Sequence, residues 1–388
     1  MQDILFPKSE VKIISPQKDG AHYFFGYYDL QPYDTTGRYH LAHQVDFMDR
    51  LPDKNDSAQI GVIDTQTSKF ERVAETSAWN FQQGAMLRWY DKDSILYNIR
   101  KKDGFGCVIK NIRTGESREY PLPVASVSPE SGYSLSINFS RIYDFRAGYG
   151  YSDVPDPFYD ENAPQKDGVF LQNMRTGEAK LLISYRQLVE TFPEPPFTTG
   201  KILVNHITFN PSGTKFVFLL RTFPTDEKMW ATQLLCSDLQ GNLTRLTHFQ
   251  FNSHYSWMDD SHLLIVTDWQ RDGWGLDQFD VEKNTCELLE IPELKGRDIH
   301  CLYSPDRKYI LGDGYPDAQQ YRPLFLFHTE TKEFFPLVYS KSLGDSIWDA
   351  RSDLHARWSP DGRKISFDAT HTGSRTICEM DMSKILQK

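Results

Sequence analysis

The sequence lacks the marks of several protein classes. Its 388 residues include five cysteines but no Cys-x-x-Cys pair, so neither a disulfide framework nor a zinc ribbon is expected. No apolar run is long enough to cross a membrane. The first residues show no basic stretch followed by an apolar one, which a signal peptide would have. We therefore expect a cytoplasmic protein, or a periplasmic or exported protein whose signal peptide has been removed.

An excess of positive charge is also missing. Lys and Arg number 43 against 53 Asp and Glu, a formal net charge of −10, and no basic tract is present, which argues against nucleic acid as a partner. The motifs GxSxG, GxGxxG, HExxH and the P-loop are absent as well. Aromatic residues make up 14% of the chain, which argues against disorder.

What is present is a turn motif that recurs seven times. Each copy has an aromatic or β-branched residue, a tight turn rich in Pro, Asp, Ser and Gly, and then a segment typical of a strand. The copies begin at Tyr33, Trp89, Val127, Phe209, Trp257, Tyr303 and Trp358. Most intervals are close to the length of one four-stranded propeller blade, about 40 to 50 residues, and the longest holds an insertion.

A second motif, strand–polar turn–strand, forms the outer half of each repeat. Complete copies lie at residues 60–73, 107–120, 169–183, 233–246, 275–289 and 323–337. The seventh copy is half complete: the strand at 375–380 lacks a partner, and 11–15 is a lone strand at the other end of the chain. The two halves predict an all-β fold, a seven-bladed β-propeller whose ring is closed by the N-terminal strand completing the last blade.

Length alone suggests two or three domains, but all-β chains can be longer as one unit. We therefore expect one propeller domain over residues 1–388, with a loop insertion at 140–167. The blades are expected to start near residues 24, 81, 124, 204, 252, 298 and 353.

Histidines occupy one repeated position, three residues before the aromatic residue of the turn motif. They are His206, His254, His300 and His355. Equivalent positions on adjacent blades surround the central channel of a propeller, so we expect four imidazoles near one mouth. Imidazoles there suit metal binding or proton transfer, although each is also explained as a polar plug bonded to a neighbouring blade.

The loops expected on the same face carry most of the polar and aromatic chemistry. Arginines with aromatic rings suit an anionic sugar, because rings stack on a pyranose face and guanidinium groups bind a carboxylate. The opposite face has short generic turns. Packing of the aromatic residues against one another explains any single position but not this difference between the faces.

The segments at 300–306 (His-Cys-Leu-Tyr-Ser-Pro-Asp) and 355–362 (His-Ala-Arg-Trp-Ser-Pro-Asp-Gly) resemble the repeats of TolB-type propellers. More closely, the chain resembles the oligogalacturonate lyases, seven-bladed propellers of similar length. That family holds a divalent cation, usually described as manganese, through three histidines and one glutamine. By motif position His300 and His355 match two ligands. The other two fall at Arg357 and near Ser352, which leaves His254, Arg357 or Gln83 as candidates to complete a changed site.

The leading hypothesis is a lyase that cleaves a uronate-containing oligosaccharide or polysaccharide by β-elimination. This reaction needs a neutralised carboxylate beside the C5 proton and a base to remove that proton. We expect His206 as the base and Arg221 and Arg141 on the carboxylate, with Tyr143 and His371 as candidates for protonating the leaving oxygen. The residues expected to bind the anionic glycan are His43, Arg100, Trp269, Arg271, Tyr315 and Arg357. Those expected to hold a divalent cation, manganese or calcium, are His254, His300 and His355.

Two other functions remain open. A glycoside hydrolase, for example one acting on rhamnose–glucuronate linkages, would use a carboxylate pair, and its candidates are Asp46, Asp268, Asp313 and Asp368. A non-catalytic propeller that binds glycan or protein is the other alternative, because the fold alone implies no reaction.

Overall fold

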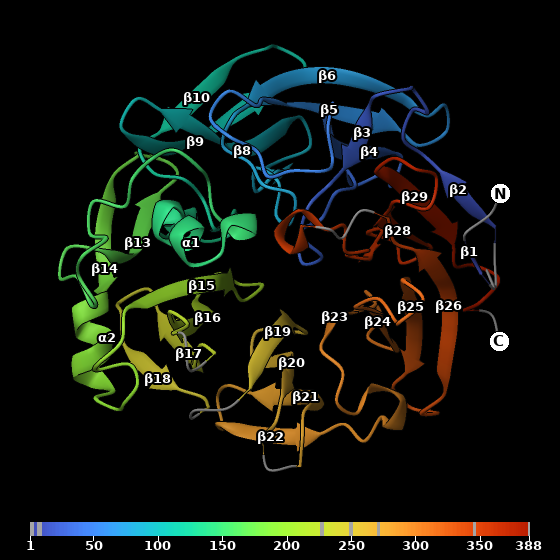
Figure 1. Ribbon diagram of the computed structural model, residues 1–388. Helices are drawn as coiled ribbons and strands as arrows, with labels where there is room; N and C mark the ends of the chain where they lie inside the picture. Colours follow the sequence, from blue (N-terminus) through green and yellow to red (C-terminus); the bar gives the residue numbers. More distant parts are fainter. Residues whose placement is uncertain are drawn as a thin grey trace. The chain divides into compact units, whose positions relative to one another are not determined.

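The protein is a seven-bladed β-propeller, described here from a computed structural model. The described residues are 10–225, 229–247, 251–269, 272–343 and 347–386, together with the backbone of residues 4–5. Over these residues the strands form seven antiparallel sheets, as the repeated turns predicted (Figure 1). None of the helices in the described part of the chain is long and apolar enough to cross a membrane.

Contacts divide the chain into two compact units. The first comprises residues 1–98, 109–118 and 297–388, and the second comprises residues 99–108 and 119–296. The strands of the second sheet, β7 (Arg88–Trp89), β8 (Ser94–Lys101), β9 (Gly104–Asn111) and β10 (Ser117–Tyr120), are shared between them. A single domain over the whole chain stays a prediction.

The first unit contains three further sheets. One consists of β3 (His22–Phe24), β4 (Tyr39–Val45), β5 (Ala58–Asp64) and β6 (Lys69–Thr76). The next consists of β23 (Ile299–Tyr303), β24 (Tyr309–Gly314), β25 (Tyr321–His328) and β26 (Phe334–Lys341), with β1 (Ile4–Leu5) added beside β26. The last consists of β27 (Arg357–Trp358), β28 (Lys364–Ala369), β29 (Thr376–Asp381) and β2 (Val11–Ile13). A short 3₁₀ turn, η3 (Trp348–Ala350), precedes β27.

The second unit contains the other three sheets. They are β11 (Ser126–Ser128), β12 (Tyr133–Ser136), β13 (Gly168–Asn173) and β14 (Ala179–Ser184); β15 (Ile202–Phe209), β16 (Lys215–Thr222), β17 (Thr232–Asp238) and β18 (Leu243–Arg245); and β19 (Asn252–Trp257), β20 (His262–Thr267), β21 (Gly275–Asp280) and β22 (Thr285–Leu288). The helical elements here are α1 (Phe139–Phe145), η1 (Ala147–Tyr149), α2 (Tyr185–Thr191) and η2 (Pro292–Leu294).

The N-terminal strand completes the last blade, and this prediction is confirmed. Strand β2 pairs antiparallel with β29, with Val11 opposite Met380 and Ile13 opposite Cys378 (Figure 1). The backbone groups of β29 that would otherwise form an open sheet edge are therefore paired. The two strands that lack a partner in the sequence motif therefore form one antiparallel pair, although they come from opposite ends of the chain.

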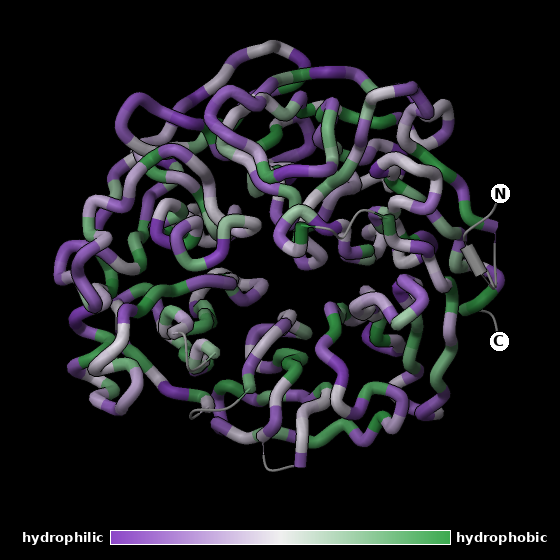
Figure 2. The backbone as a smooth tube through the Cα atoms, in the orientation of Figure 1, coloured by the Kyte–Doolittle hydropathy of each residue, from purple (hydrophilic) through white to green (hydrophobic). Residues whose placement is uncertain are grey.

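The hairpin turns have the side-chain chemistry that the sequence motif requires. In the last blade Ser359 Oγ donates to Asp361 and accepts from the Lys364 amide at 3.0 Å, while Gly362 adopts φ +69°. A side-chain cap followed by a left-handed glycine closes the turn without a steric penalty. Apolar strand residues then pack between the sheets, for example Leu311, Phe367 and Met380, which are at most 1% exposed. Figure 2 shows the resulting mixture of hydrophobic and hydrophilic segments along the strands.

Two of the repeated histidines distort the start of their blades. His206 and His355 both adopt φ +44°, the left-handed region that residues with a side chain avoid. At His206 the pairing of β15 with β16 skips one residue, so the imidazole sits on a β-bulge. Strained backbone of this kind is concentrated at functional sites, which directs attention to these two positions.

Candidate functional site

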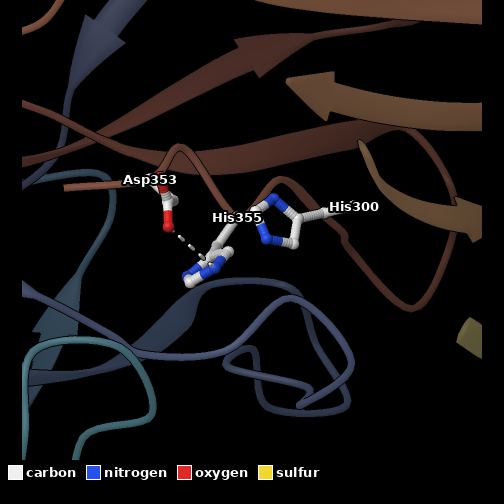
Figure 3. A group of neighbouring side chains, drawn as sticks. All are labelled: His300, Asp353 and His355. Atoms are coloured by element: carbon white, nitrogen blue, oxygen red, sulfur yellow. Dashed lines mark ion pairs between the residues drawn. The ribbon is translucent and has the colours of Figure 1, made fainter. Parts of the chain in front are cut away.

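Three buried side chains of the first unit converge where β23 and the segment before β27 meet. They are His300, Asp353 and His355, and one potential ligand atom from each lies within 4.8 Å of the others (Figure 3). All three are at most 2% exposed. Two imidazoles and a carboxylate are ligands that first-row divalent metals use in proteins.

The protonation of His355 leaves one ring nitrogen available. Its Nδ1 lies 2.8 Å from the carbonyl oxygen of Gly26, and because a carbonyl only accepts, Nδ1 carries the hydrogen. Burial, reinforced by His300, lowers the pKa of His355 well below its ordinary value, so the ring is neutral. Its Nε2 therefore presents a lone pair and lies 3.9 Å from a carboxylate oxygen of Asp353. It has no hydrogen-bond partner within the described part of the chain.

His300 is oriented in the same way by a carboxylate. Its Nδ1 lies 3.0 Å from Asp313 Oδ2, and the other oxygen of Asp313 accepts from the backbone amide of Ala356 at 3.2 Å. The two imidazoles are in contact, with ring centroids 4.4 Å apart. A carboxylate or carbonyl behind each imidazole is the usual arrangement behind histidine ligands of a metal.

Asp353 is held by two buried arginines. Arg322 Nη1 lies 2.6 Å from Oδ1, and Arg351 reaches both oxygens, at 3.1 Å from Nε and 2.8 Å from Nη2. Burial opposes ionisation, but Arg351 and Arg322 keep the pKa of Asp353 well below its ordinary value. The carboxylate is thus ionised and fixed in place.

These residues fit a divalent cation. A neutral imidazole nitrogen and an ionised carboxylate oxygen face each other across 3.9 Å, and a cation between them would be attracted to both. His300, Asp353 and His355 would supply three ligands, and substrate or water would occupy the remaining positions.

Arg357 lies beside the cluster, and only part of its guanidinium group is bonded to the protein. Its Nε donates to the carbonyl of Tyr27 at 3.1 Å, and its Nη2 contacts the carbonyl of Gly26 and Asp368. Nη1 is buried, and no described residue is its hydrogen-bond partner. A buried guanidinium with an unused edge is a site for an anionic group, and the sequence-based role of Arg357 in binding glycan stays a prediction.

The segment 26–29 adds groups that the sequence analysis missed. The rings of Tyr27 and Tyr28 pack against His355 and His300, at centroid distances of 4.9 and 5.1 Å. Burial raises the pKa of Asp29 to about 6, and Arg88 and Arg357 partly oppose this shift. A carboxyl with a pKa in this range is suited to proton transfer near neutral pH.

A second group of predicted residues lies in the other unit. The ring of His206 is 6.1 Å from that of His254 and 5.6 Å from that of Tyr149. Arg221 is 4% exposed, and its guanidinium lies 5.8 Å from the Trp230 ring. The structure therefore brings the four repeated histidines together as two pairs, His206 with His254 and His300 with His355, and a single mouth with all four stays a prediction.

Two predicted site residues, Arg141 and His43, are fully buried and bonded to other parts of the protein, and their predicted roles stay predictions. Arg141 is 0% exposed and uses all five N–H groups on protein acceptors, including Asp156 at 2.9 Å. These bonds tie the 140–167 insertion to Ile202, so binding of a substrate carboxylate by Arg141 would require one of them to break. His43 is also 0% exposed, and its Nε2 accepts from the Ala85 amide at 3.1 Å.

The remaining predicted residues are placed as follows. Arg100 donates to the carbonyl of Ser152 at 2.7 Å, and Trp269 packs edge-on against Phe279. The partly exposed side chains are Tyr143 on α1 and His371 between β28 and β29. Arg271 lies outside the described residues. Tyr315 lies near the metal candidate, with its ring 6.1 Å from that of His300.

The sequence did contain a signal for the missed ligand. Asp353 and His355 are two residues apart, the spacing that places side chains on the same side of extended backbone.

Gln82, the neighbour of the candidate Gln83, contacts Arg351 through both ends of its amide. Two of the carboxylates proposed for hydrolysis have partners near this cluster: Asp313 is bonded to His300, and Asp368 accepts from the Phe25 amide and pairs with Arg357.

The fold is similar to those of solved enzymes. A structure of an oligogalacturonate lyase in complex with manganese is 14% identical, with a TM-score of 0.72 over 100% of this chain and 96% of that chain. The chain shares its fold with the oligogalacturonate lyases. A second such lyase, from Vibrio parahaemolyticus, is 14% identical with a TM-score of 0.67, over 98% of this chain and 96% of that chain.

The oligogalacturonate lyase fold is not restricted to lyases. A prolyl endopeptidase structure is 11% identical with a TM-score of 0.52, over 93% of this chain and 47% of that chain. No protein-family model matches the sequence, and no curated protein matches it. Function therefore has to be argued from the site.

Proposed function

We propose that the protein is a lyase that cleaves a uronate-containing oligosaccharide, such as an oligogalacturonate, by β-elimination with the help of a divalent cation. The observation that carries this proposal is the buried group of His300, Asp353 and His355 with three arginines around it. The shared fold with oligogalacturonate lyases, one of them a manganese complex, supports it.

The arginines suit a substrate that carries a carboxylate. Arg322 and Arg351 neutralise Asp353, so they leave the cluster with an ionised ligand that does not repel an anion strongly. Arg357 keeps Nη1 for the substrate. A neutral sugar would leave this buried donor unpaired, which favours a uronate over a neutral pyranose.

The reaction is a proton abstraction followed by loss of a leaving group. A base removes the C5 proton, the electron pair of that bond forms the C4–C5 double bond, and the C4–O4 bond breaks, with a proton going to the leaving oxygen. The bound cation would neutralise the substrate carboxylate and so make the C5 proton more acidic. Arg357 would orient the same carboxylate and stabilise the negative charge that develops on it.

Two groups are candidates for the base. The sequence points to His206, which lies on a strained bulge in the second unit. The first unit offers Asp29, whose pKa of about 6 leaves it ionised at neutral pH. Substituting each in turn, His206→Gln and Asp29→Asn, separates them. Only loss of the base removes the acidic limb of the pH profile, the fall in activity as the base becomes protonated.

The direct test is ultraviolet absorbance of the unsaturated product during incubation with trigalacturonate. A rise that chelation abolishes and manganese restores is the expected result. New reducing ends without this absorbance would identify a hydrolase and overturn the proposal. Binding of trigalacturonate with neither signal would identify a non-catalytic glycan-binding propeller.

A further inference from the structure

An exposed tryptophan lies at the end of a chain of contacts that begins in the candidate metal centre. Trp348 is 49% exposed, although tryptophan is a residue that proteins normally bury to a large extent. Its ring stacks on that of Tyr315 with centroids 5.6 Å apart and planes 28° apart. An exposed indole is unremarkable by itself, so what matters is how it is held.

Arg351 fixes both rings to the cluster. Its guanidinium carbon lies 4.5 Å from the Trp348 ring centroid and 5.5 Å from the Tyr315 ring centroid. Its Nη1 donates to the carbonyl of Trp348 at 3.0 Å, while Nε and Nη2 bind Asp353. A buried arginine therefore ties the indole, by side chain and backbone, to a metal ligand.

The Tyr315 ring makes a second connection. It lies 6.1 Å from the ring of His300, another of the candidate ligands. The aromatic pair is thus attached to the cluster at two points, which limits the freedom that the indole would lose on binding a ligand.

We infer that Trp348, backed by Tyr315 and Arg351, forms a sugar-binding subsite that stacks on a pyranose ring next to the one whose carboxylate is held at the cluster. This inference rests on the proposed function and extends it to a substrate of at least two sugar rings. The apolar C–H face of a pyranose matches an aromatic plane, and its hydroxyl groups remain in water. A fixed, half-exposed indole beside a carboxylate-binding site provides that plane.

The test compares Trp348→Ala, Trp348→Phe and the wild type on di-, tri- and tetragalacturonate, by the ultraviolet absorbance of the product. Trp348→Ala should raise KM for trigalacturonate about tenfold, with most of the loss of kcat/KM in KM. Trp348→Phe should recover most of it, because a flat ring is restored. A KM within twofold of the wild type for the alanine variant would overturn the inference.

Trp274→Ala is the matched control. Trp274 is 36% exposed and also stacks on an aromatic ring, that of Phe251 at 4.7 Å, but it lies in the second unit. Its substitution should leave KM unchanged. An equal effect of both substitutions would show a general cost of losing a surface indole and would count against a subsite at Trp348.

A failure of the proposed function gives a different result. If the wild type cleaves none of these substrates, calorimetric titration with trigalacturonate still compares it with Trp348→Ala. Weaker binding by the variant would support the subsite without a lyase. Equal binding by both, or no binding by the wild type, would overturn the subsite as well.

Discussion

His355 Nε2 and Asp353 Oδ2 face each other across 3.9 Å in a buried site, with no hydrogen bond between them. Each atom is already fixed from behind, His355 by the carbonyl of Gly26 and Asp353 by Arg351. Two acceptor atoms that face each other in this way can both bind a cation placed between them. This relationship is the strongest structural reason to expect a metal here.

Removing the carboxylate should weaken metal binding. Asp353→Asn keeps the shape of the side chain but loses its charge, so the affinity for manganese should fall at least about tenfold. Isothermal titration of manganese into the purified protein measures it. Asp103→Asn, at an exposed aspartate of the β8–β9 turn, is the control and should bind as the wild type does. Unchanged affinity in Asp353→Asn would remove this residue from the ligand set.

Arg357 should not tolerate a conservative replacement. Arg357→Lys keeps the charge but loses the forked donor, and we expect kcat/KM on trigalacturonate to fall about 100-fold. Near-native thermal unfolding would show that the fold is retained. Partial recovery of Arg357→Ala activity on adding guanidinium at a low, non-denaturing concentration would indicate that the missing group itself is what matters.

His43 should make the protein sensitive to acid. Burial lowers the pKa of His43 to about 4, while the unfolded chain takes up this proton near the ordinary value of 6.5. Stability from the neutral buried ring is therefore present above pH 6.5 and is lost as the pH falls towards 4, by about 1.4 kcal/mol per pH unit. Urea unfolding between pH 7 and 5 should show a smaller slope for His43→Gln.

Gly84 should resist substitution, because it packs against His43. It adopts φ +59°, and a Cβ added there would lie 2.3 Å from Cε1 of the imidazole. Gly84→Ala should lower the free energy of unfolding by about 2–4 kcal/mol. Gly104→Ala meets no atom within 4 Å and has no positive φ, so it should be nearly neutral. Similar effects of the two substitutions would contradict this account.

Arg141 should affect stability before it affects chemistry. Arg141→Met leaves Asp156 buried without its partner and should cost about 3–5 kcal/mol in the free energy of unfolding. Arg186→Met, at an exposed position on α2, should cost little. A stable Arg141→Met protein that has lost only activity would support the catalytic role that the sequence predicts.

The number of blades and the closure of the ring followed from the sequence. The turns at Asp34–Gly37 and Ser359–Gly362 are local, since Pro, Asp and Gly impose their geometry without distant contacts. The strands at 11–15 and 375–380 each lack a partner nearby in the sequence. Pairing them with each other leaves no open sheet edge in the last blade, so the sequence predicts that the ring of blades closes there. Alternation of residues within a strand and the turns between neighbouring strands depend on residues close together in the sequence, so both can be read from it.

The candidate site depended on tertiary structure. His300 and His355 could be selected by their repeated position, but Asp353 became a ligand candidate only because Arg322 and Arg351 hold it 3.9 Å from His355 Nε2. The role of Arg141 on a substrate carboxylate stays a prediction, but its carbonyl partners, spread over the insertion and as far as Ile202, could not be read from the sequence. The sequence shows which residues are charged. Whether that charge faces a ligand or a backbone carbonyl is decided only when distant segments pack together.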